Sequence, residues 1–471
     1  MSPSTTISTP QQSKRMSTWI PELSTETWQQ WWQETQNGLS ALEFCDKPGE
    51  FSAFPVLLDE ALFEGIRLDL PKLLNLARRI SRQDGNVQKW ARADQLEVVL
   101  AYGDVPEVPA IARPDGIFVG DQLKLLELNL GSGVGGFFEV DYVQSRFRRL
   151  AEIAGLSDTH TPDASSALVD LIRQVREASP LAPFKIAMMP LRHFRPYHVR
   201  QAHQLAQRVN DEVRDCECRI AYADQLHNQD GWLSDGVNQF HMVWMNGAPM
   251  HPEELMAPVM KALMAGRASN TLVLSNPCDM AVEGKLVLAA LSEGLESHSR
   301  HFNDDDRSLI ERYVPWSRTV TPRNVAYQGK NFDLQELMYE HRAGLVLKRG
   351  HSKSTQQVFI GAEQSDAQWR ECLAVAFAED SQWMVQENLR SNAQTFAYCD
   401  AQGKPESQAQ CFTYNQFVFG QGSSAPLIRI ERDPNRRKVA MAVSSAMAIT
   451  GTILCSAESI AKQVAARSAD E

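Results

Sequence analysis

The sequence lacks several patterns that define large classes of proteins. Its eight cysteines are scattered over 471 residues without a Cys-x-x-Cys pair, so neither a zinc site nor a disulfide framework is expected. No apolar run reaches the ~18 residues of a membrane span, so we expect no membrane partner. The polar N-terminus does not have the pattern of a signal peptide. We therefore expect a soluble, cytoplasmic protein with reduced thiols.

An excess of positive charge is also missing. The formal net charge of -11 argues against a general nucleic-acid binder, although a local basic cleft for a phosphorylated ligand is compatible with it. The content of 43% hydrophobic and 22% charged residues is typical of a globular protein. A chain of 471 residues exceeds one ordinary core, so we expect several domains or one large enzyme with subdomains. The oligomeric state is left open, and a homo-oligomer is compatible with the sequence.

The N-terminal part divides into a polar tail and a helical layer. Residues 1–18 are rich in Ser, Thr, Gln and Pro, and we expect them to be disordered. Residues 19–110 contain apolar positions at helical spacing, which predicts a helical layer. Trp28 and Trp32 lie on one face of a predicted helix, next to Trp31. This tryptophan cluster could be a substrate platform, but packing against the next domain is the favoured interpretation.

A hairpin is predicted near residue 120, in the segment 111–183 that also carries two helices. Apolar runs at 116–119 and 123–128 flank Gly120-Asp121-Gln122, a composition typical of a β-hairpin. With this three-residue loop, Asp115 lies opposite Glu127. Strand side chains alternate with period 2, so Asn129 follows on the same face.

The oxygen atoms of this hairpin suggest a metal site. Two carboxylates and one amide oxygen converge at one end of the hairpin, with Arg113 beside them. Such hard oxygen ligands suit Mg²⁺, which usually takes one or two protein carboxylates and completes its coordination with phosphates of a substrate. The alternative is that these are ordinary solvated strand ends and turn residues, and it is the more common role for such a hairpin alone.

Residues 184–280 change to another pattern. Strand-like segments beginning at Phe184, Cys218, Gln239 and Thr271 are interspersed with amphipathic segments at 198–211 and 254–266. Alternation of this kind predicts a parallel α/β unit, which binds ligands beyond the carboxyl ends of its strands.

Residues 281–438 carry the cationic candidates. Lys285 stands at the start of a short predicted helix, and Lys348 stands at the end of a predicted strand. The polar turn that follows contains His351, Lys353 and Ser354 before the next strand at 357–360. Cations, hydroxyls and backbone N–H groups in such a turn can cover a phosphate. Residues 439–471 are rich in Ala and Ser, which predicts a C-terminal helix or a tail.

Taken in order, these motifs resemble the ATP-grasp ligases. The pattern Arg113-Pro-Asp115 followed by Glu127-Leu-Asn129 comes before the α/β unit and before both lysines. This order is similar to the circularly permuted ATP-grasp group, represented by the synthetase domain of glutathionylspermidine synthase. The resemblance spans residues 55–435 and implies an α+β or α/β protein. Its expected architecture is a circularly permuted ATP-grasp fold with a parallel α/β pre-ATP-grasp domain and an N-terminal helical layer.

The resemblance also implies roles for individual residues. The metal ligands would be Asp115, Glu127 and Asn129, holding Mg²⁺, and the phosphate-binding lysines would be Lys285 and Lys348. Arg113 would meet a phosphate or the substrate carboxylate, and Arg429 would stabilise the transferring group. The adenine would lie along a hinge made of Gln386, Glu387, Asn388 and Leu389. The sequence departs from the family at RGHSKSTQQ, where a single Gly350 stands in place of a glycine-rich phosphate loop.

The activity implied by the resemblance is an ATP-dependent carboxylate–amine ligase. It would join a small-molecule carboxylate to an amine through an acyl phosphate and release ADP and phosphate. The glycine-poor loop keeps a second reading open, a catalytically degenerate nucleotide-binding scaffold or sensor. A third is phosphoryl transfer without ligation. The sequence contains no code that identifies the carboxylate or the amine.

Overall fold

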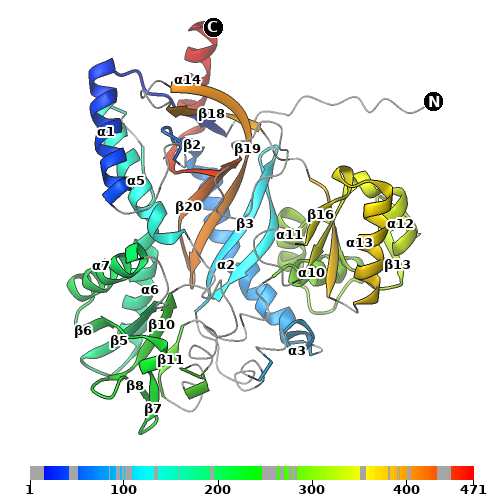
Figure 1. The fold of residues 1–471 in the computed structure, drawn as a ribbon, viewed down its shortest axis with the longest axis horizontal. Helices are drawn as coiled ribbons and strands as arrows, with labels where there is room; N and C mark the ends of the chain where they lie inside the picture. Colours follow the sequence, from blue (N-terminus) through cyan, green and yellow to red (C-terminus); the bar gives the residue numbers. More distant parts are fainter. Residues whose placement is uncertain are drawn as a thin grey trace.

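The computed structural model of the chain describes residues 15–41, 51–83, 85–91, 96–97, 100, 109–131, 136–156, 159–190, 196–246, 261–262, 264–265, 270–274, 279, 284–350, 357–379, 382–389, 391, 393–399, 405–431 and 447–470. The fold is a mixed α/β arrangement around a central antiparallel sheet, with a parallel unit on one side and a smaller helix-covered sheet on the other (Figure 1). Among the described helices, none has the length and apolarity to cross a membrane.

The central sheet joins two distant parts of the chain. Its order is β21-β20-β19-β3-β4, with β18 also pairing with β19. All of these pairs are antiparallel. The strands are β3 (Ile111–Val119), β4 (Gln122–Leu130), β18 (Ala393–Cys399), β19 (Pro405–Phe419), β20 (Gly422–Glu431) and β21 (Met447–Thr450).

Helices cover both faces of this sheet. One face packs against α5 (Phe137–Ile153) and α6 (Ala164–Ala178), and the other against α2 (Glu60–Ser81), α10 (Leu286–Glu296) and α11 (Asp304–Tyr313). The alternation of strand side chains explains the two cores, because Leu427 of β20 enters the first and Ile428 the second.

The β3–β4 hairpin pairs as expected but by a different route. The expected three-residue loop is wrong: Val119 pairs with Gln122, and the turn is Gly120-Asp121, with Gly120 at φ 61°. A β-bulge then adds Leu126 to β4, so that Asp115 faces Glu127 after all. A two-residue turn matches the twist of a hairpin, and the bulge restores the register that the shorter turn would have lost.

The parallel α/β unit is confirmed in the described residues. Its sheet has the order β11-β10-β5-β6 with parallel pairing throughout. A small antiparallel sheet is inserted between β6 and β10 and splits the expected strand at 239–245. The helix expected at 254–266 lies mostly outside the described residues. The elements are β5 (Phe184–Pro190), α7 (Pro196–Glu212), β6 (Cys216–Ile220), β7 (His227–Gln229), β8 (Trp232–Ser234), β9 (Gln239–Phe240), β10 (Met242–Asn246) and β11 (Leu272–Val273).

The smaller antiparallel sheet carries the second lysine. Its order is β12-β17-β15-β16, and α13 packs on it through Trp369 and Leu373. The elements of this region are β12 (Ser317–Thr319), β13 (Asn324–Tyr327), β14 (Lys330–Asp333), α12 (Leu334–Glu340), β15 (Leu345–Arg349), β16 (Val358–Ile360), α13 (Asp366–Ala378) and β17 (Trp383–Glu387).

The two ends of the described chain meet in a three-stranded sheet of order β1-β2-β22. The expected disordered tail at 1–18 is corrected for its last residues, because β1 is a strand, whereas residues 1–14 lie outside the described part. The expected C-terminal helix at 439–471 is also incomplete, because β21 and β22 precede α14. These strands are too short to show alternation in the sequence. The elements are β1 (Met16–Thr18), α1 (Thr25–Ala41), β2 (Val56–Asp59), α3 (Asn86–Trp90), β22 (Thr452–Cys455) and α14 (Ala457–Asp470).

The tryptophan cluster is part of the core. Trp28 and Trp31 of α1 are 8% and 1% exposed. The ring of Trp28 stacks on Phe54 at 4.8 Å, and that of Trp31 lies 6.3 Å from Phe147. The packing interpretation is therefore confirmed.

Candidate active site

Polar side chains gather on one face of the central sheet. The register places Asp115 beside both Glu127 and Asn415, and Thr413 beside Arg429. Residues that pair directly across strands share a face. The intervening positions, such as Leu128 and Ile428, face the opposite core. The polar set consists of Arg113, Asp115, Glu127, Asn129, Thr413, Asn415 and Arg429.

Asp115 holds two arginines together. It is completely buried, and its Oδ1 and Oδ2 accept hydrogen bonds from Nε and Nη2 of Arg113 at 2.8 and 3.0 Å. Nη2 of Arg429 donates to Oδ2 at 2.7 Å. Burial alone would raise the pKa of Asp115, but the two guanidinium groups outweigh it and hold the pKa below its usual value. Asp115 is therefore an anion between two cations.

Lys285 reaches the same hairpin. Its Nζ lies 3.1 Å from Oε2 of Glu127, and its side chain is 6% exposed. The backbone explains this position: the N–H of Gly284 donates to the carbonyl of Leu128 in an antiparallel bridge, and the N–H of Lys285 donates to the carbonyl of Gly350. The start of α10 is thus held between β4 and the end of β15.

Lys348 meets the hairpin from β15. Its Nζ donates to the carbonyl of Leu126, the bulge residue, at 3.2 Å and to Oε1 of Gln386 at 2.6 Å. Burial lowers the pKa of Lys348 to about 7; Glu127 opposes this shift and Lys285 adds to it. Both lysines therefore interact electrostatically with Glu127. The structure brings together Lys285, Lys348 and the hairpin.

The expected hinge begins in the last two residues of β17. Gln386 is buried, and its Nε2 donates to the Ser317 hydroxyl at 3.0 Å. The N–H groups of Glu387, Asn388 and Leu389 donate to the carbonyls of Trp316, Gly344 and Glu387, respectively. These donors are engaged within the protein in this structure, and adenine binding along the hinge stays a prediction. The other nucleotide candidates, His351, Lys353 and Ser354, lie outside the described residues.

The donor set for a metal is small. In the part of the chain that the structure describes, no group of three or more His, Cys, Asp or Glu side chains could hold an ion. Nδ2 of Asn129 donates to the carbonyl of Arg113 at 3.0 Å, so its side-chain oxygen is the atom suited to a cation. Glu127 and Asn129 fit an Mg²⁺ ion that shares its coordination with phosphates. The metal roles of all three residues stay predictions. In this structure the oxygens of Asp115 accept from guanidinium groups, and Oε2 of Glu127 is paired with Lys285.

The sequence reasoning missed two polar residues on this face. Thr413 and Asn415 of β19 are both completely buried. Nδ2 of Asn415 donates to the carbonyl of Leu427 at 2.6 Å and to the hydroxyl of Thr413 at 2.9 Å. Its Oδ1 is buried without a hydrogen-bond partner. The signal was the alternation in Phe412-Thr413-Tyr414-Asn415, whose polar members share the face of Asp115.

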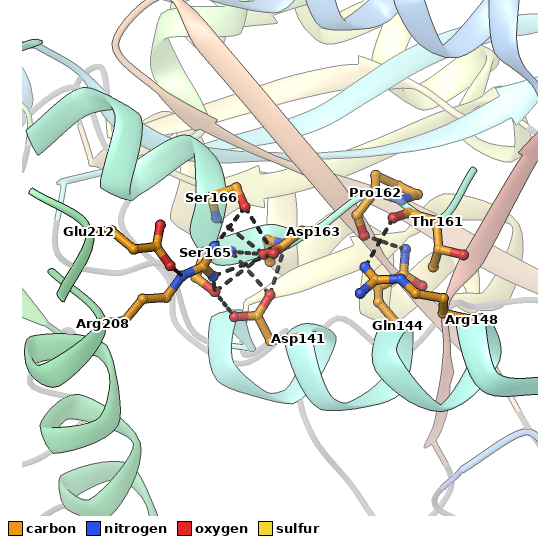
Figure 2. Close-up of polar contacts among 11 residues, drawn as sticks. Asp141, Gln144, Arg148, Thr161, Pro162, Asp163, Ser165, Ser166, Arg208 and Glu212 are labelled. Atoms are coloured by element: carbon orange, nitrogen blue, oxygen red, sulfur yellow. Dashed lines mark hydrogen bonds and ion pairs between the residues drawn. The ribbon is translucent and has the colours of Figure 1, made fainter. Parts of the chain in front are cut away.

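A second carboxylate pair lies where α5, α6 and α7 meet (Figure 2). Asp163 caps α6, and Asp141 of α5 accepts hydrogen bonds from the N–H groups of Ala164 and Ser165. Burial and the neighbouring Asp163 raise the pKa of Asp141 to about 7. Arg208 of α7 donates to the Ser165 hydroxyl at 2.8 Å. This network joins the central sheet's helices to the parallel unit.

Comparisons with known proteins support the fold. No protein-family model matches the sequence, and no curated protein matches it either. The structure is similar to that of a glutathione synthetase-like effector from Globodera pallida in its apo form. The TM-score is 0.61 at 14% identity, covering 92% of this chain and 98% of the other. A protein from Methylobacillus flagellatus, provisionally assigned as a gamma-glutamylcysteine synthetase, gives a TM-score of 0.42 at 11% identity over 82% and 88% of the chains, too low to carry an argument.

The similarity to the Globodera pallida protein defines the fold class of this chain. The chain is a mixed α/β protein with several sheets, and it shares the fold of a glutathione synthetase-like protein. At this level of identity the similarity shows the fold alone. The circular permutation and the ATP-grasp assignment stay predictions.

Proposed function

We propose that the protein is an ATP-dependent ligase that joins a carboxylate to an amine. The observation that carries the proposal is the convergence of Lys285 and Lys348 on Glu127, on the same sheet face as the arginine pair around Asp115. The lysines come from two segments outside the central sheet. Their meeting at one hairpin supports a phosphate site.

The grouping of cationic side chains at this site supports an anionic ligand. Four buried cationic side chains, Arg113, Lys285, Lys348 and Arg429, are grouped around two carboxylates, Asp115 and Glu127. Glu139 in the first turn of α5 adds a third acid that acts on Arg113. Cationic side chains grouped on one face can contact several anionic oxygens at once, which favours a ligand such as a triphosphate together with a carboxylate.

The residues can divide the chemistry between them. Lys285 and Lys348 would bind the phosphates, and Glu127 and Asn129 would hold Mg²⁺. A bound Mg²⁺ ion would neutralise phosphate charge. The substrate carboxylate attacks the γ-phosphorus to give an acyl phosphate and ADP, and the amine then displaces phosphate. Arg113 and Arg429 lie on the same face and can stabilise the oxyanion of the second step. No protein nucleophile is required.

The test is substrate-dependent ADP release. Purified protein is mixed with Mg-ATP and paired small carboxylates and amines, and both ADP and amide product are measured. We expect one pair to give both, and Glu127→Gln to lower the rate at least about a hundredfold. The matched control is Asp121→Asn at the exposed turn of the same hairpin, which should retain the rate.

Other outcomes separate the alternatives. The glycine-poor loop after Lys348 favours a scaffold or sensor. Such a protein would bind ATP but release no ADP with any pair of substrates. Phosphoryl transfer would give ADP without an amide. Full activity in Glu127→Gln would show that the reaction does not need the Glu127 carboxylate, and the proposed metal position would be wrong.

A further inference from the structure

A buried ion pair lies next to the segment that carries Lys285. Nε and Nη2 of Arg78 donate to Oδ1 and Oδ2 of Asp279 at 2.7 and 2.8 Å. The two side chains are only 5% and 2% exposed. Arg78 belongs to α2, whose neighbouring residues Ala77 and Ile80 are in the core under the central sheet. The pair therefore ties Asp279 to the rigid part of the molecule.

The contacts of Asp279, Gly284 and Lys285 follow β4 in order. A Cβ atom placed on Gly131, just after β4, would lie 3.7 Å from Cβ of Asp279. Gly284 forms an antiparallel bridge with Leu128, and Lys285 reaches Glu127. Positions 279, 284 and 285 thus contact positions 131, 128 and 127, respectively. The residue numbers rise on one segment and fall on the other, as in an antiparallel pair. Because β4 is at the edge of the central sheet, these contacts lie along that edge.

We propose that Arg78 and Asp279 are positioning residues that place the Lys285 ammonium beside Glu127. The planar guanidinium makes two parallel hydrogen bonds to the carboxylate, so it fixes direction as well as distance. With Asp279 held at Gly131 and Gly284 held at Leu128, two contacts fix where the chain leading into Lys285 lies along β4. The effect on catalysis rests on the proposed function, whereas the effect on Lys285 does not.

The first measurement follows Lys285 directly. Arg78→Met/Asp279→Leu removes both charges while keeping apolar volume, a change that often leaves stability intact. The ligand-free proteins are treated with an amine-acylating reagent, and the labelling rate of Lys285 is followed by peptide mass spectrometry. We expect Lys285 to be labelled at least about tenfold faster than in the wild type. Without the Arg78–Asp279 ion pair, the chain around Lys285 should open locally more often. Arg78→Lys keeps the positive charge but cannot make two parallel hydrogen bonds to Asp279. The labelling rate of Lys285 in this variant should lie between those of the wild type and the double variant.

A matched control exists one residue further along α2. Arg79 pairs with Asp306 of α11 at 2.5 Å and also donates to the carbonyl of His301. Arg79→Met/Asp306→Leu removes an ion pair from the same helix and should leave Lys285 labelling unchanged. Equal labelling in wild type and in the Arg78/Asp279 variant, both folded by circular dichroism, would overturn the positioning role.

The second measurement concerns ATP. In the Arg78/Asp279 variant the KM for ATP should rise roughly ten- to a hundredfold, the size of one displaced charge-assisted contact, while the KM for the carboxylate changes little. If Lys285 were labelled faster but the ATP affinity measured by calorimetry were unchanged, the positioning role of the Arg78–Asp279 pair would stand. The role of Lys285 in ATP binding would be overturned. A loss of activity that affects all substrates equally, with unchanged labelling, would indicate a structural role only.

Discussion

Replacing Lys348 by methionine should change how stability depends on pH. In the unfolded chain the lysine pKa is 10.5, whereas burial lowers it to about 7 in the folded protein. Between these values the unfolded state binds a proton that the folded state has released, so the free energy of unfolding rises with pH. Below pH 7 both states are protonated, and the folded protein bears the whole cost of the buried charge.

The magnitude follows from this difference. At about 1.4 kcal/mol per pKa unit, the burial of the charge costs the folded state up to about 5 kcal/mol at pH 6. Removal of Lys348 also leaves the Leu126 carbonyl and the Gln386 side chain without their donor, at about 1–3 kcal/mol each. These losses nearly offset the gain. They do not depend on pH, so the comparison between two pH values isolates the titration.

The free energy of unfolding of Lys348→Met minus that of the wild type is therefore expected to be about 3 kcal/mol larger at pH 6 than at pH 9. Urea unfolding followed by tryptophan fluorescence at both pH values measures this difference. Lys330→Met, at an exposed position of β14, is the control and should show no such change. If the two pH values gave the same difference for Lys348→Met, the lysine would be charged in the folded state and the burial argument would fail.

Three further substitutions test other buried contacts of the structure. Asp115→Asn leaves Arg113 and Arg429 without their anion and should cost about 3–5 kcal/mol in urea unfolding; wild-type stability would contradict their pairing. Asp141 has a folded-state pKa of about 7, above its unfolded value, so its contribution to stability falls as pH rises from about 4 to 7. Asp141→Asn should remove that slope in unfolding experiments at pH 4, 5.5 and 7, and an unchanged slope would exclude Asp141 as its source. Trp31→Ala should cost about 3–5 kcal/mol without changing ATP affinity by calorimetry, and a selective loss of binding would revive the platform interpretation.

The sequence predicted correctly which residues of the hairpin face each other. Asp115 and Glu127 are opposite each other in the hairpin, as the expected three-residue loop predicted, but the turn is shorter and a bulge at Leu126 compensates. The bulge was not visible in the sequence, because a single extra apolar residue in a strand has no compositional signature. It matters nonetheless, since the Leu126 carbonyl accepts the Lys348 hydrogen bond.

The partners of the site depended on distant parts of the chain. Nothing near Asp115 in the sequence indicates that Arg429 donates to it, because that contact requires β19 and β20 to pair with β3. Asn415 was missed for the same reason. Its polar alternation was visible, but its place beside Asp115 follows only from the register between β19 and β3.

The sequence by itself determined the presence of the hairpin, the parallel unit and the residue types of the candidate site. Those features depend on side-chain alternation and helical spacing, which are properties of short segments. Only the tertiary structure decided that Lys285, Lys348 and Arg429 meet this hairpin and that Arg78 holds Asp279 beside it. These contacts are made when separate apolar faces of the central sheet and its helices pack together, and many different arrangements of the same segments would satisfy the local pattern equally well.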